Sequence, residues 1–128
     1  MNAIHRHRLT VTEARPRSQV TTLAREQLPD VPGKILVTAL VTFPPRAYSA
    51  AHRHPGSVMT LVLTGTLRSQ LSGGPPRNYS AGATLFEPAG AVHLFAENPS
   101  ETHSAQLLAV FVTDDDSGPL VVPAARNE

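Results

Sequence analysis

Two histidines separated by one residue are the feature of this chain that points most directly to chemistry. His52 and His54 lie where extended-looking sequence resumes after a proline pair. Residues i and i+2 of a β-strand face the same side, so both imidazoles would enter one space. A third histidine, His93, follows the tight corner 88–91. We predict that these three side chains meet at one metal ion.

The composition restricts how that metal is held. The chain has no cysteine, so histidine, carboxylate or amide groups must supply the ligands. Three imidazoles suit zinc, iron, nickel or manganese and leave positions open for water or a substrate. We expect one divalent ion, although the residue types do not select among these metals, and no catalytic residue is assigned. The alternative is a set of histidines that remains without metal.

The segments that must position these histidines read as short strands. β-Branched and apolar runs alternate with glycine and proline, and no segment keeps a helical period. This rhythm indicates an all-β sandwich or barrel. The clearest expected strands cover residues 34–43, 58–64, 66–71, 77–80, 83–87, 92–96 and 105–113, with a β-rich stretch at 17–26 and an edge strand or tail at 120–123.

The histidine pair fits the first of two motifs of a known family. That motif is glycine, five residues, His-x-His, three or four residues, glutamate, six residues and glycine. His52, His54 and Gly65 match it. Arg46 stands at the opening glycine, and Val58 occupies the glutamate position.

The second motif is glycine, five residues, proline, any residue, glycine, two residues, histidine, three residues and asparagine. Gly82, Pro88, Gly90 and His93 match it, and Asn98 comes one residue late. With both motifs in order, the sequence resembles a small single-domain cupin. The resemblance implies a double-stranded β-helix, or jelly-roll barrel, with a metal in its mouth.

The missing glutamate shapes the function that we expect. Without that negative charge, a metal on three histidines would be more electropositive and would attract a small anionic or oxygen-rich molecule. Some cupins with three-histidine sites are iron dioxygenases, so a dioxygenase is one expectation. The alternatives are a metal-dependent isomerase or lyase acting on a sugar acid, and a barrel that binds or senses a ligand without turnover. Whether the protein is an enzyme stays open.

Five further residues are candidates for the lining of the pocket. Val58, Thr60 and Val62 share one face if their strand alternates regularly, which would place them beneath the metal. Glu87 is interpreted as a rim carboxylate, with a replacement ligand as the alternative. Phe95 lies two residues beyond His93 and is the best aromatic candidate for the pocket.

Length and charge define the remaining expectations. The 128 residues predict one domain: an N-terminal arm over 1–16, a barrel over 17–113 and a C-terminal tail over 114–128 that packs on a partner subunit. The arm holds a second His-x-His, His5 and His7, which we interpret as solvated. Charged residues make up only 16% of the chain, which favours a homodimer.

Several partner classes are not expected. The net charge is +1 and aromatic residues are few, so a nucleic-acid surface is not indicated. No apolar run is long enough to cross a membrane, and the basic start lacks the apolar stretch of a signal peptide. We therefore expect a cytoplasmic protein that acts on a small molecule.

Overall fold

The computed structural model describes residues 15–125, so His5 and His7 lie outside the described residues. The described chain contains eleven strands and no helix, and accordingly no helix that could cross a membrane is found there. The strands are β1 (Gln19–Gln27), β2 (Lys34–Phe43), β3 (Tyr48–Ser49), β4 (His52–Arg53), β5 (Ser57–Thr64), β6 (Thr66–Leu71), β7 (Arg77–Ser80), β8 (Thr84–Glu87), β9 (Val92–Glu97), β10 (Ala105–Asp114) and β11 (Val122–Pro123).

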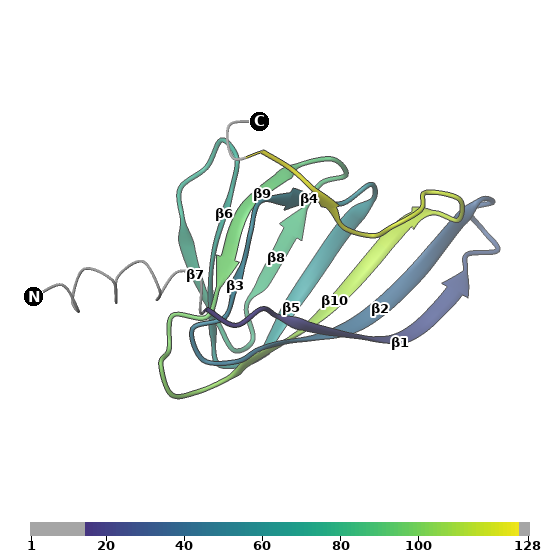
Figure 1. The fold of residues 1–128 in the computed structure, drawn as a ribbon. Helices are drawn as coiled ribbons and strands as arrows, with labels where there is room; N and C mark the ends of the chain where they lie inside the picture. The colour runs from purple at the N-terminus through teal and green to yellow at the C-terminus, as the bar shows by residue number, and fades with distance from the viewer. Residues whose placement is uncertain (1–14, 126–128) are drawn as a thin grey trace, which may run out of the picture.

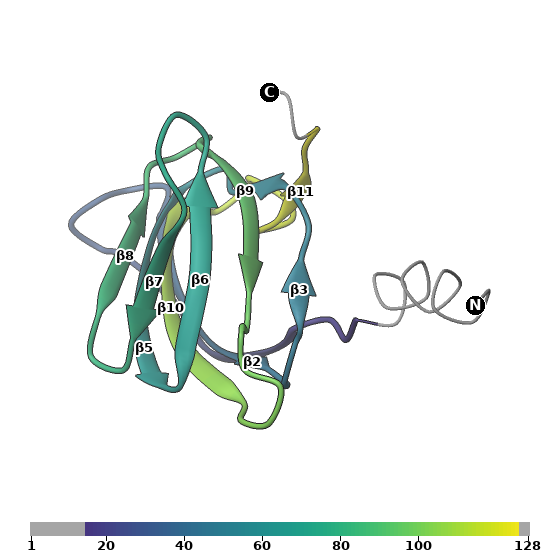
Figure 2. The same cartoon turned by 90° about the vertical axis from the view of Figure 1, so that its left-hand side faces the viewer.

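Two antiparallel sheets form the barrel (Figure 1). One has the strand order β1-β2-β10-β5-β8, and the other has the order β11-β4-β9-β6-β7, with β3 added beside β9. Strands adjacent in a sheet are mostly distant in sequence, as in a jelly roll (Figure 2). The predicted all-β jelly-roll fold is confirmed.

The core follows from the period-2 pattern of the strands. Along β10, every second side chain from Ala105 to Thr113 is buried, and β2 shows the same alternation except that Val41 is only partly buried. The inward residues form two clusters between the sheets. One contains Phe43, Ala47, Val62, Leu67, Leu85, Ala96, Ala105 and Leu107, and the other contains Ile35, Val37, Ala39, Val58, Ala109 and Phe111.

The chain turns from one sheet into the other at a glycine. Gly65 separates β5 from β6 and has a φ of 77°. A side chain there would meet the Ser104 carbonyl oxygen at 2.8 Å. Both the backbone angle and the close approach therefore require glycine. The gap between the expected strands 58–64 and 66–71 is thus a tight bend from one sheet into the other.

A β-bulge changes which residues of β9 face inward. Leu71 pairs with His93 and Gln70 pairs with Phe95, so one extra residue of β9 lies between the two pairs. The inward positions that follow His93 are displaced by one residue as a result. This displacement matches the late position of Asn98, whose buried amide donates to the Phe43 and His103 carbonyl oxygens.

The described part of the predicted tail lies against its own barrel. β11 pairs with β4, with Val122 opposite Arg53. The Ala124 amide also donates to the Ala51 carbonyl oxygen. We call residues 117–125 the C-terminal strap, which runs beside β4 at the upper end of the barrel (Figure 1).

Candidate metal centre

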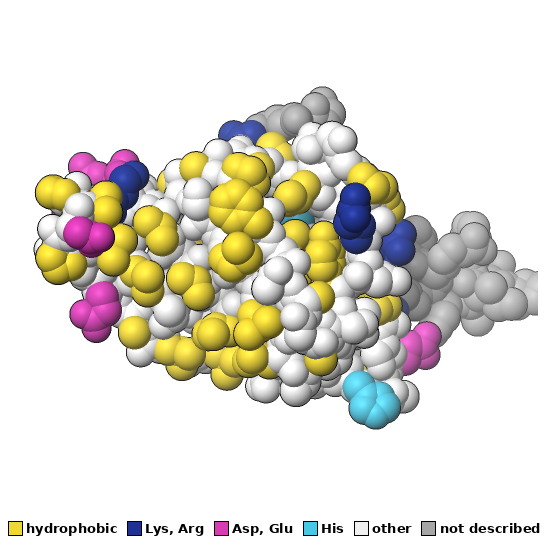
Figure 3. Space-filling view, turned by 180° about the vertical axis from the view of Figure 1, so that it is seen from behind, with side chains coloured by type: hydrophobic (Ala, Val, Ile, Leu, Met, Phe, Trp, Pro, Cys, Tyr) yellow, Lys and Arg dark blue, Asp and Glu magenta, His cyan; other side chains and the backbone are white. Residues whose placement is uncertain are grey.

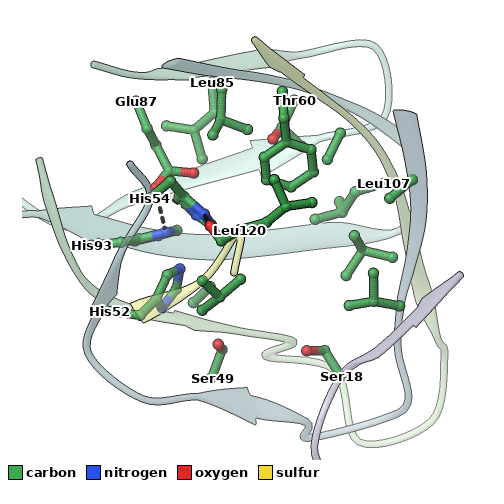
Figure 4. Close-up of a pocket in the computed structure, with 18 of the residues that line it drawn as sticks. Ser18, Ser49, His52, His54, Thr60, Leu85, Glu87, His93, Leu107 and Leu120 are labelled. Carbon is green, nitrogen blue, oxygen red and sulfur yellow. Dashed lines mark hydrogen bonds and ion pairs between the residues drawn. The ribbon is translucent and has the colours of Figure 1, made fainter. Parts of the chain in front are cut away.

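A cavity of about 280 Å³ lies between the two sheets. Four ionisable side chains gather at one end of it: His52, His54, Glu87 and His93 (Figure 4). They come from β4 and the residue after it, from β8 and from β9. The fold thus brings the three predicted histidines together and adds a carboxylate to them.

His52 and His54 each direct one ring nitrogen away from the cavity centre and into a backbone hydrogen bond. Nδ1 of His52 donates to the Ala50 carbonyl oxygen at 2.8 Å, and Nδ1 of His54 donates to the Leu120 carbonyl oxygen at 2.7 Å. With the proton on Nδ1, each Nε2 keeps its lone pair. A neutral imidazole held by its second nitrogen is the form that binds a metal.

His93 presents its opposite nitrogen to the cavity. It pairs with His52 across β4 and β9, and their ring centroids are 4.9 Å apart. Its Nε2 forms a short hydrogen bond with the buried hydroxyl of Ser69 on β6. Its Nδ1 is then directed at Glu87, with 3.1 Å between Nδ1 and Oε1.

Glu87 reaches the same point from the strand beside β5. It pairs with Val58, and since paired residues share a face, it enters the cavity where the Val58 side chain also points. Only 4% of Glu87 is exposed, so it is an interior residue and not the rim carboxylate that we expected. Its Oε1 lies 3.5 Å from Nε2 of His54.

The arrangement fits a cation. One ligand atom from each of His52, His54 and Glu87 lies within 4.8 Å of the other two. Glu87 Oε1 and His93 Nδ1 are buried, yet neither has a hydrogen bond of acceptable geometry. Buried polar atoms normally have a partner, and a metal ion is a partner that both atoms could share. The tightest set is thus two histidines and one carboxylate, with His93 beside them.

Burial and mutual proximity perturb two of these groups. Burial would raise the pKa of Glu87, but the surrounding histidines, His93 above all, outweigh it and hold that pKa below its ordinary value. Burial is the main cause that lowers the pKa of His52. The neighbouring imidazoles of His93 and His54 lower that pKa further, whereas the hydrogen bond to Ala50 and the charge of Glu87 raise it. Both shifts favour the charge states that a metal requires, an ionised carboxylate and a neutral imidazole.

Beyond this polar end, the cavity is largely apolar. Its lining includes Ala39, Val41, Phe43, Leu67, Leu85, Ala96, Leu107, Ala109, Phe111, Leu120 and Val121. Among the described residues that line it, none is lysine or arginine. The polar additions are hydroxyl groups, on Ser18, Thr22, Ser49 and Thr60.

The predicted pocket residues divide into two groups. Val58 and Thr60 line the cavity together with Glu87. Val62 continues the same face but is buried in the core cluster below, where it packs with Leu67 and Leu85. Phe95 is not among the lining residues, because the bulge in β9 brings Ala96 inward in its place, and its ring stacks on Tyr48.

Sequence reasoning did not identify the Ser69 hydroxyl or the Leu120 carbonyl, which hold His93 and His54. The pairing of β6 with β9 is not readable from local sequence, so no signal marked Ser69. The apolar run 120–122 after an acidic turn was a signal for the C-terminal strap. The side-chain alternation of β8 could have identified Glu87 as an inward residue, because the apolar Leu85, two residues earlier on the same face, is buried.

Comparison with known proteins gives one match by sequence model and many by structure. The model of the cupin domain family matches residues 39–111, which contain all four ionisable residues of the site. No curated protein sequence matches.

Solved structures share the fold. The DMSP lyase DddQ from Ruegeria pomeroyi DSS-3 is 22% identical with a TM-score of 0.67, and the alignment covers 88% of this chain and 54% of the lyase. This chain therefore spans about half the length of that protein.

Two further structures extend the comparison. A cupin superfamily protein from Desulfitobacterium hafniense DCB-2 is 16% identical with a TM-score of 0.62, covering 82% of this chain and 86% of the other. A recombinant oxalate oxidase in complex with glycolate is 25% identical with a TM-score of 0.63, covering 83% of this chain and 54% of the oxidase.

Proposed function

Because this chain belongs to the cupin family, we propose that it is a metal-dependent enzyme whose ion is held by His52, His54, His93 and Glu87. The observation that supports this most directly is a buried four-donor cluster that opens onto an apolar cavity. The subset His52, His54 and Glu87 is two histidines and one carboxylate, which with open positions is typical of non-haem iron oxygenases, and His93 would be a fourth ligand beside it. We therefore favour an O₂-dependent dioxygenase acting on a small chelating molecule.

The protein's own residues would bind and orient that molecule. A bound ion would supply Lewis acidity and, as iron, the means to react with O₂. The Ala50, Leu120 and Ser69 contacts hold the three imidazoles in place. The apolar walls exclude water and receive the part of the substrate that does not chelate.

The walls also narrow the class of substrate. We expected a small anionic or oxygen-rich molecule, but no lysine or arginine among the described lining residues is available to pair with a second negative charge. Burying such a charge unpaired is strongly unfavourable. The better fit is a molecule with one chelating head, anionic or neutral, on a mainly apolar body. A polyhydroxylated sugar acid and a dianion such as oxalate fit less well.

Metal content tests the first part of this proposal. We would measure it by mass spectrometry on wild type, His52→Ala, Glu87→Ala and His103→Ala, each purified without added metal or chelator. His103 is an exposed loop histidine and serves as the matched control. We expect about one equivalent in wild type and the control and a large loss in the other two. Equal metal in all four proteins would refute the site.

Oxygen consumption tests the second part. Iron-loaded protein would be given acetylacetone, a small diketone, and zinc-loaded protein would be the control. Uptake of O₂ with iron and none with zinc is the expected result. Product formation with zinc and without O₂ would instead indicate an isomerase or lyase. Thermal stabilisation by the probe without any product would indicate a ligand-binding barrel.

We also propose that a second copy of this chain covers the outer face of the five-stranded sheet. Phe86, Met59 and Val110 form one row across that face, and Leu61, Leu108 and Leu40 form the next. Met59 and Phe86 are 46% and 49% exposed. The face is seen from outside in Figure 3, where hydrophobic side chains are spread over it among uncharged polar groups and backbone, and charged side chains lie near its ends.

A two-fold interface brings this face against the same face of a second copy, so any charge on it would lie close to a like charge. The two central rows carry no charged residue, and the face can therefore pack on its own copy. Exposed apolar patches of this kind mark interaction sites. Light scattering after size exclusion should give a dimer for wild type and a monomer for Met59→Glu. The control is Asn78→Glu, which adds the same charge at an exposed position on β7 of the other sheet. A monomeric wild type would contradict the proposal.

A further inference from the structure

We propose that Thr60 determines substrate specificity by hydrogen-bonding an uncharged polar group on the body of the substrate. This inference rests on the proposed function, because the metal fixes the other end of the molecule. It identifies the substrate as a chelating head joined to an apolar body that carries one hydroxyl, carbonyl or amide group.

The position of the Thr60 hydroxyl supports this inference. Thr60 is only 4% exposed and lines the cavity, and its oxygen is turned toward the interior (Figure 4). No described residue forms a hydrogen bond with that hydroxyl, although the backbone of Thr60 pairs normally with Leu85 and Ala109. The hydroxyl is reached from the cavity and has no protein partner, so a ligand that displaces water from it must supply the hydrogen bond that the water made.

The surroundings of Thr60 distinguish it from the other hydroxyl groups of the cavity. Ser18, Thr22 and Ser49 are all partly or fully exposed, so water can satisfy them. Leu85 and Ala109 flank Thr60, and both line the cavity. A charged group there would meet one neutral hydroxyl and apolar walls, which is too little to compensate its lost hydration. The group that Thr60 receives is therefore uncharged.

Strand geometry gives the spacing between the two polar points. Val58 lies opposite Glu87, and Thr60 is two residues further along β5 on the same face. Two residues of a strand span roughly 6.5–7 Å. Thr60 thus lies roughly 7 Å along the strand from the row of residues that holds Glu87, and the second polar group of the substrate lies beside Thr60 on that next row.

The test compares two probes that differ by one hydroxyl. Both pentanohydroxamic acid and 5-hydroxypentanohydroxamic acid have a metal-chelating head. Their dissociation constants would be measured by calorimetry on nickel-loaded wild type, Thr60→Val and Thr60→Ser. Thr60→Val keeps the shape and removes the hydroxyl, whereas Thr60→Ser keeps the hydroxyl. Metal content and melting temperature would be recorded for all three proteins.

Wild type and Thr60→Ser should prefer the hydroxylated probe by roughly 2- to 12-fold, the ratio that one net hydrogen bond provides. Thr60→Val should lose or reverse that preference without a fall in melting temperature or metal content. An unchanged preference in metal-loaded Thr60→Val, or a fall in its melting temperature, would overturn this inference alone. Absence of metal from all three proteins would overturn the proposed function and this inference with it.

Discussion

Val58 and Glu87 face one another across β5 and β8, so the carboxylate enters the site from the strand beside the one that the family motif uses. The motif expects glutamate at the position of Val58. Here that position is apolar, and Glu87 projects from the paired residue into the same cavity. Glu87 thus places a carboxylate in the cavity from the neighbouring strand, opposite the motif position that lacks one.

Moving the carboxylate from position 87 to position 58, where the family motif has it, should preserve the metal site. Loss of a residue that only holds a metal ligand in place typically weakens metal binding roughly 10- to 100-fold. Since Glu87 would bind the metal itself, we expect Glu87→Val to weaken binding by at least that much. Adding Val58→Glu to that variant should recover most of the affinity, because the two positions face the same space. Competition with a chelator of known affinity gives both values. If the double variant binds no better than Glu87→Val, the two positions are not equivalent.

Ser69 should matter through His93. Its hydroxyl holds Nε2 of that imidazole, and without it the ring is free to turn away from Glu87. Ser69→Ala should therefore lower metal affinity about 10- to 100-fold while the barrel stays folded. The matched control is Ser80→Ala, which removes an exposed β7 hydroxyl on the opposite side of β6. Equal affinity in both variants would show that the serine does not position the ring.

The C-terminal strap should support His54 in a similar way. Its Leu120 carbonyl accepts the Nδ1 proton of His54, and the Leu120 side chain lines the cavity. Deleting residues 117–128 should lower metal affinity about 10- to 100-fold. Deleting only 126–128 should have no effect. Chelator competition measures the affinity, and circular dichroism checks the fold. Full affinity in the long deletion would mean that His54 is held without the strap.

Arg46 should be a position where glycine stabilises the protein. It has a φ of 65°, the left-handed region that glycine adopts freely, and it stands where the family motif has glycine. Left-handed backbone is unfavourable by about 1–2 kcal/mol for other residues, while glycine loses roughly 0.5–1 kcal/mol more conformational entropy on folding. Arg46→Gly should raise the unfolding free energy in urea by up to about 1 kcal/mol. The control is Arg46→Ala, which keeps the unfavourable left-handed backbone. If Arg46→Ala raised the unfolding free energy as much as Arg46→Gly, the cause would be loss of the arginine side chain and not relief of backbone strain.

Much of the fold was predictable because its signals are local. Alternation of apolar and polar residues and the glycine and proline breaks give the strands. The pair of motifs indicated the jelly roll, and the three histidines of those motifs do meet at one end of the cavity. Val58 and Thr60 were found by the same period-2 argument.

The errors came from relations between strands. Phe95 was expected inside because it lies two residues beyond His93, but the β9 bulge displaces the alternation by one residue. A displacement of one residue moves a side chain to the opposite face, and nothing in the local sequence of β9 announces it. Val62 is buried on the predicted face in a core cluster with Leu67 and Leu85, but it is not among the residues that line the cavity.

The sequence by itself determined the elements and the donor types: short strands, three imidazoles at motif spacing and no thiolate. The tertiary structure alone decided which further groups join those imidazoles. Glu87, Ser69 and the Leu120 carbonyl come from segments far apart in the chain, and they meet because antiparallel pairing fixes the register of β8 on β5, β6 on β9 and β11 on β4. Register depends on packing across the whole barrel, so no local pattern encodes it.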